Sequence, residues 1–144
     1  MGARSRLRRL AALTAALALA LTAPACSNLA ASTGDEEDRF VATAHSQVQT
    51  TRLVAEAALE DPPAPAVTLT VILDEARTEL TGVRDDLAAR PGGHETLMTL
   101  LDDSIGLVDR TRSAVEDADR DALREARRQA AALAVAFEDE SELL

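Results

Sequence analysis

Few residues of this chain have side chains suited to catalysis or metal binding. Its 144 residues include one cysteine, Cys26, and two histidines, His45 and His94. One cysteine cannot form an internal disulfide or a cysteine-based zinc site, and two histidines leave little for a catalytic triad or a multi-histidine metal centre. We find no nucleophile beside a plausible base. The sequence therefore predicts a non-enzymatic protein, with no catalytic residue, metal site or cofactor.

Two sets of residues resemble metal ligands without completing a site. His94 and Met98 are neighbours on a helix face, and an imidazole beside a thioether could bind copper(I), but two ligands are too few. We interpret Met98 as a core residue and His94 as an exposed residue at a loop end. His45 flanks the apolar line of its segment, so we interpret it as a boundary residue.

The second set is Asp117, Asp119 and Asp121, which are spaced like the opening of a calcium-binding loop. Such a loop needs glycine at its sixth position and glutamate at its twelfth, where this chain has Ala122 and Arg128. We interpret these aspartates as a solvated turn in which Asp119 caps a helix.

Charge and composition argue against nucleic acid as a partner. The chain has 15 basic residues, all arginine, against 25 acidic ones, and its aromatic residues are two phenylalanines. An acidic surface without aromatic platforms would repel phosphates and offer nothing for bases to stack on. The basic cluster of Arg124, Arg127 and Arg128 is expected to pair with nearby acids such as Asp121 and Glu125. Acidic pairs are expected to lie on solvated faces, and these are Asp85-Asp86, Asp102-Asp103, Glu116-Asp117 and Glu138-Asp139-Glu140.

The first 25 residues have the features of a signal peptide. Four arginines fall within residues 1–9 and precede an apolar run over residues 10–22, which is too short to span a bilayer as a helix. Ala23 and Ala25 then lie three and one residues before Cys26, as a signal peptidase requires. Cleavage after residue 25 would remove four arginines and no acid, so the mature domain is more acidic than the precursor.

The tetrapeptide Ala23-Pro24-Ala25-Cys26 resembles the lipobox of bacterial lipoprotein precursors. The resemblance covers residues 1–26 and implies that the Cys26 sulfur receives a diacylglycerol, usually with acylation of the new amino group. Two or three acyl chains hold a protein stably on a membrane, whereas one does not. We therefore expect a lipid anchor at the outer face of the bacterial cytoplasmic membrane. The alternative is ordinary cleavage after Ala25, which would release a secreted protein.

The mature chain is expected to be all-α, with a flexible tether over residues 26–34 and an up-down four-helix bundle over residues 35–144. Apolar residues recur every three or four positions in four segments, about 35–60, 67–90, 94–117 and 119–140. Thr33 and Glu36 fit a capping box at the first helix. Prolines end the first segment, and Pro91-Gly92-Gly93 ends the second. The alanine-rich core buries a modest area, so a homo-oligomer could supplement its stability.

The boundary between the third and fourth segments has no proline or glycine. We predict a break there because it makes Asp119 an N-cap and places Asp121 in a first turn, where negative charge is favoured. The alternative is one continuous helix over residues 94–140 that pairs with a second molecule.

These features predict a membrane-tethered, extracytoplasmic lipoprotein that acts as a protein-interaction or scaffold module with an unidentified protein partner. A second hypothesis, from another class, is a bundle that binds a small ligand or a cation.

Overall fold

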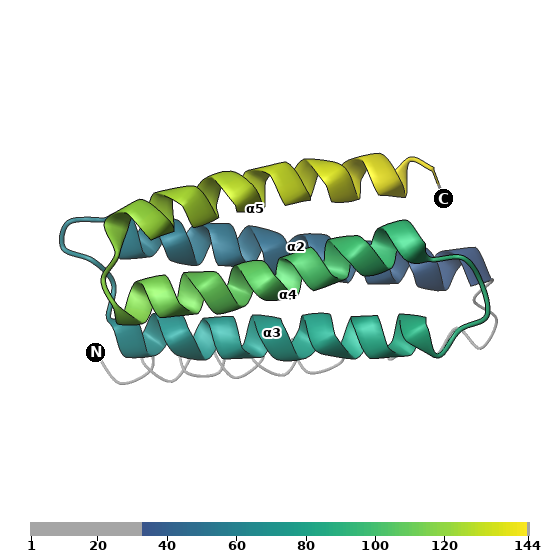
Figure 1. Ribbon diagram of the computed structural model, residues 1–144, viewed down its shortest axis with the longest axis horizontal. Coiled ribbons are helices and arrows are strands. Elements are labelled where there is room, and N and C mark those ends of the chain that lie inside the picture. The colour runs from purple at the N-terminus through teal and green to yellow at the C-terminus, as the bar shows by residue number, and fades with distance from the viewer. Residues whose placement is uncertain (1–32, 144) are drawn as a thin grey trace, which may run out of the picture. The chain divides into compact units, whose positions relative to one another are not determined.

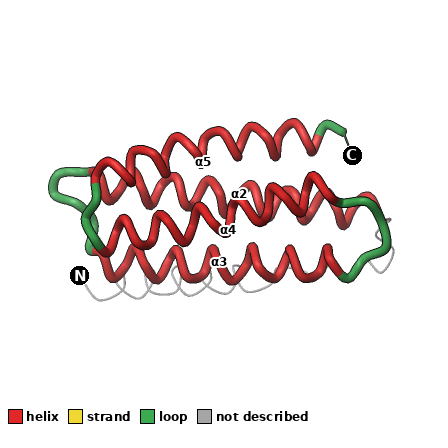
Figure 2. The backbone as a smooth tube through the Cα atoms, viewed as in Figure 1, coloured by secondary structure: helices red, strands yellow, loops and turns green. Residues whose placement is uncertain are grey.

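Four α-helices follow one another in the computed structural model, which describes residues 33–143. They are α2 (Thr33–Leu59), α3 (Ala66–Ala88), α4 (Glu95–Glu116) and α5 (Arg120–Ser141). Each helix packs against the next, and α5 packs back against α2, with a further diagonal contact between α2 and α4. Figure 1 shows consecutive helices running up and down, and Figure 2 shows helices and loops without strands among the described residues. The predicted all-α, up-down four-helix bundle is confirmed.

The helix boundaries fall within two residues of those expected from the sequence. The one difference that affects the predicted tether is at the first helix, because α2 already includes Thr33 and Gly34. The predicted signal peptide and residues 26–32 of the tether lie outside the described residues.

One apolar stripe from each helix forms the core. On α3, all six positions of the clearest stripe are buried, namely Leu69, Leu73, Ala76, Leu80, Val83 and Leu87. Phe137 of α5 is completely buried, and it is the largest side chain in the core. This agreement follows from the helical period, because residues three and four apart share a face and bury together.

Three polar side chains, Thr51, Ser104 and Thr111, are also completely buried. Each hydroxyl donates a hydrogen bond to the carbonyl oxygen four residues earlier in its own helix, at 2.9, 2.7 and 2.8 Å respectively. Their polar groups are therefore satisfied without a partner helix. Ser104 and Thr111 were missed by the sequence interpretation, which counted apolar residues along α4.

The break between α4 and α5 lies at residues 117–119, as predicted. Ala118 has a φ of 52°, and the Asp119 amide donates to the Ala114 carbonyl at 2.9 Å, which is the pattern of a Schellman motif. The Asp119 side chain then accepts hydrogen bonds from the amides of Asp121 and Ala122, both at 3.0 Å. Asp119 is therefore the N-cap of α5, and residues 94–140 do not form one helix.

Candidate functional site

The three residues that the sequence assigns to processing and lipidation are Ala23, Ala25 and Cys26. All three lie outside the described residues, and their roles stay predictions. Over residues 33–143, no helix combines the length and the apolar character needed to cross a membrane.

A groove of about 540 Å³ lies between the first half of α2 and the second half of α3. Arg90, just after the end of α3, organises one end of this groove. Its Nη1 lies 2.5 Å from Glu36 Oε2, and its guanidinium carbon lies 4.8 Å from the centre of the Phe40 ring. The other lining residues are Arg39, Thr43, Thr78, Glu79, Gly82, Val83 and Asp86.

The ion pair between Glu36 and Arg90 shifts the pKa of both groups in the groove. The hydrogen bond and the positive charge of Arg90 hold the pKa of Glu36 below its usual range, and Glu36 in turn raises the pKa of Arg90. The hydroxyl of Thr78 is already bonded to the Asp74 carbonyl, at 2.9 Å. The arrangement therefore offers a small molecule a mixed-charge surface with one aromatic ring, and the ion pair at one end fastens α2 to the residues that follow α3.

His94 is not the exposed loop-end residue that the sequence predicts. Its side chain is only 16% exposed, and its Nδ1 lies 3.7 Å from Glu37 Oε1 on α2. The turn before it brings the ring back over Gly92, which has a φ of +149°; a Cβ there would lie 2.8 Å from His94 Nε2. Gly92 thus needs to be glycine both for its backbone angle and for the space that the ring occupies.

The other two residues considered as metal ligands, His45 and Met98, make contacts that are typical of structural residues. His45 is 31% exposed and lies between Gln49, at 3.4 Å, and Glu138, at 3.5 Å, which confirms it as a boundary residue. Met98 is partly buried against the core, as predicted. Among residues 33–143, no group of three or more histidine, cysteine, aspartate or glutamate residues is placed to hold a metal ion.

Two of the three arginines of the basic cluster on α5, Arg124 and Arg128, pair with the predicted neighbours. Arg124 Nη1 lies 2.6 Å from Asp121 Oδ1, and Arg128 forms an ion pair with Glu125. Arg128 and Gln129 both donate hydrogen bonds to Glu125, which lowers the pKa of that carboxyl group.

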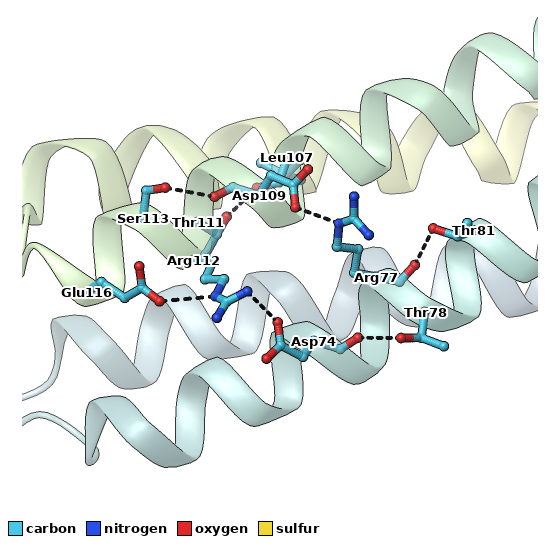
Figure 3. Close-up of polar contacts among 10 residues, drawn as sticks. All are labelled: Asp74, Arg77, Thr78, Thr81, Leu107, Asp109, Thr111, Arg112, Ser113 and Glu116. Atoms are coloured by element: carbon cyan, nitrogen blue, oxygen red, sulfur yellow. Dashed lines mark hydrogen bonds and ion pairs between the residues drawn. The ribbon is translucent and has the colours of Figure 1, made fainter.

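A set of ion pairs between α3 and α4 was not predicted. Arg77 Nε lies 2.9 Å from Asp109 Oδ1, and Arg112 Nη1 lies 2.8 Å from Asp74 Oδ1 (Figure 3). Arg112 also bonds Glu116, at 3.1 Å, so it joins acids from both helices. A further pair, Arg84 with Asp102, links the same two helices. Asp102, one of the acids expected to be solvated, therefore also forms an ion pair between α3 and α4.

No protein-family model matches this chain, and comparisons with curated proteins and with solved structures found no match.

Proposed function

We propose that this chain is an exported bacterial lipoprotein, held at the outer face of the cytoplasmic membrane by lipid on Cys26, whose helical bundle acts through contacts with other proteins. The observation that carries the proposal is the order of segments at the start of the chain. A basic stretch, an apolar run and Ala23-Pro24-Ala25 precede the chain's only cysteine. Lipidation would use that sulfur and remove a reactive thiol.

The short distance along the chain between Cys26 and α2 supports the anchoring role. Six residues separate Cys26 from Thr33, the first residue of α2. A chain of this length reaches at most about 24 Å, so the bundle would stay close to the membrane. Its excess of acidic residues would keep it from binding anionic lipids directly.

The outer surface supports a role in protein contacts. Leu53, Val67, Val71 and Val135 are all more than half exposed, on a surface that is otherwise rich in charge. Val67 and Val71 lie one turn apart at the start of α3, beside the proline-rich loop. Partly exposed apolar groups of this kind gain free energy when a partner covers them.

Labelling of cells with a radioactive fatty acid tests the anchor. We expect the wild-type chain to take up the label and Cys26→Ser to take up none. Ser27→Ala, one position away, should label like the wild type. A wild-type chain without label would contradict the proposed anchor.

A photo-crosslinking amino acid tests the protein contacts. Placed at Val71 in living cells, it should give a discrete crosslinked product, whereas the same group at the buried Leu73 should give none. Absence of products from Val67, Val71 and Leu53 alike would contradict the interaction role.

A further inference from the structure

The outer face of α5 carries a regular stripe of exposed residues. α5 contacts α2 and α4 but not α3, and Figure 1 shows it along one edge of the bundle. Its buried stripe consists of Leu123, Ala126, Ala130, Ala134 and Phe137. The opposite stripe, which we call the α5 outer stripe, consists of Arg124, Arg128, Ala132, Val135, Asp139 and Glu142, all exposed. Their spacing of three or four residues keeps them on one face.

Charge along the α5 outer stripe changes sign from one end to the other. Its first two residues are Arg124 and Arg128, its centre is Ala132 and Val135, and its last two are Asp139 and Glu142. The acids at the end of α5 are the charge that the helix dipole disfavours there, because the C-terminal end of a helix is its negative end. Within the last turn of α5 there is no basic residue to offset the acids.

We propose that the α5 outer stripe is a self-association surface on which two copies of this chain pack, α5 against α5, in antiparallel orientation. A two-fold axis between Ala132 and Val135 places Arg128 opposite Asp139 of the second copy. The same axis brings Arg124 close to Glu142 of the second copy. Because the charges are antisymmetric about the centre of the stripe, the basic end of one copy meets the acidic end of the other.

The centre of the stripe suits close packing of two helices. Val135 is 55% exposed in the single chain, and the axis sets it against Ala132 of the second copy. Ala132 has a short side chain, and with Gln129, Leu133 and two residues of α4, Asp103 and Arg110, it lines a hollow of about 340 Å³ between α4 and α5. Small residues at a crossing let helix axes approach to about 8 Å, and burial of the two valines would add to the ion pairs.

Arg124 and Arg128 each form an ion pair within their own chain, but they can still contact the acids of the second copy. Arg124 bonds Asp121, and Arg128 bonds Glu125. A guanidinium has five donor hydrogens, and the Arg128 side chain remains 65% exposed. Arg128 can therefore keep Glu125 and also bind Asp139 of the second copy.

The association is independent of the lipid anchor, because the stripe lies on α5 and its C-cap Glu142, far along the chain from Cys26. If both copies are lipidated, the antiparallel arrangement puts their α2 N-termini at opposite ends of the dimer. Both anchors could then enter one membrane when the helices lie along its plane.

Charge reversal tests the proposal in the full chain. All variants carry Cys26→Ser, so that neither lipid nor an intermolecular disulfide can join two copies, and are studied in mild detergent by analytical ultracentrifugation. We expect a dimer for the parent chain. Arg128→Asp and Asp139→Arg should each weaken dimerisation by about tenfold or more, because each sets like charges opposite one another. The double variant should restore the dimer.

Val135→Glu should also disrupt the dimer, and Ala88→Glu is its matched control. Ala88 is exposed on α3, which makes no contact with α5, so its substitution should leave the dimer intact. Circular dichroism melting of each variant separates loss of the dimer from loss of the fold. A monomeric parent chain, a dimer that survives both single reversals, or a folded double variant that stays monomeric would each overturn the proposal.

Discussion

Arg120, the first residue of α5, donates a 2.8 Å hydrogen bond from Nη2 to the carbonyl oxygen of Leu59, the last residue of α2. The last carbonyl groups of a helix have no partner within it, and a positive charge there also opposes the negative end of the helix dipole. This contact joins the C-terminal end of α2 to the N-terminal end of α5, at the end of the bundle away from the start of α2 (Figure 1).

Removal of this contact should loosen that end of the bundle. We expect Arg120→Ala to lower the free energy of unfolding by about 1 kcal/mol, the usual net value of one such hydrogen bond. Urea denaturation followed by circular dichroism measures the change. Arg127→Ala, an exposed arginine on the same helix, is the control and should shift the midpoint much less. Equal shifts in the two variants would contradict the capping role.

Replacement of Ala118 by glycine should stabilise the fold. Its φ of 52° lies in the left-handed region, where a Cβ is unfavourable and glycine is the common residue after a helix. We expect Ala118→Gly to raise the free energy of unfolding by about 1 kcal/mol, in contrast to glycine substitutions within the helices. A lower unfolding midpoint for Ala118→Gly than for the wild type would show that Ala118 does not adopt this conformation.

The two phenylalanines should differ in their contribution to stability. Phe137 is completely buried, and Phe137→Ala should cost roughly 3–5 kcal/mol through lost burial and the cavity that remains. Phe40 is partly buried beneath Arg90, so Phe40→Ala should cost about 1–2 kcal/mol through partial burial and the lost cation–π contact. Chemical denaturation of both variants checks the order; a larger loss at Phe40 would contradict the assigned core.

Acid should weaken the contact between α2 and α3 through Glu36. Because Arg90 lowers the pKa of Glu36 in the folded state, this carboxylate stabilises the fold above its unfolded pKa. That contribution is lost as the pH falls through the lower folded pKa. The drop in melting temperature between pH 7 and pH 3 should therefore be smaller in Glu36→Gln than in the wild type.

The same experiment at high salt provides a control. The Glu36 side chain is partly exposed, so 0.5 M salt should screen its pair with Arg90 and reduce the difference between the two proteins. An identical pH dependence in wild type and variant at low salt would contradict a stabilising role for this pair.

The features of the fold that depend on local sequence could be predicted. The stripe from Leu69 to Leu87 follows from helical periodicity, and the Asp119 cap follows from the residue types at the start of a helix. Neither needs information about distant parts of the chain. The break at Asp119 could therefore be predicted even though no glycine marks it.

Features that depend on how elements pack could not be predicted. The pair Arg112 with Asp74 requires the register of α4 on α3, which no local pattern specifies. The covered position of His94 depends on the path of a short turn back toward Glu37. Ser104 and Thr111 are polar by type, and a hydrogen bond to the backbone of α4 removes the cost of burying their hydroxyl groups.

The most direct test of the proposed function is the intact mass of the mature N-terminal peptide, purified from membranes of the native cells. We predict that the chain begins at Cys26 and carries a diacylglycerol in thioether linkage to its sulfur. A chain that begins at Cys26 with a free thiol, or one that still begins at Met1, would contradict the proposed anchor.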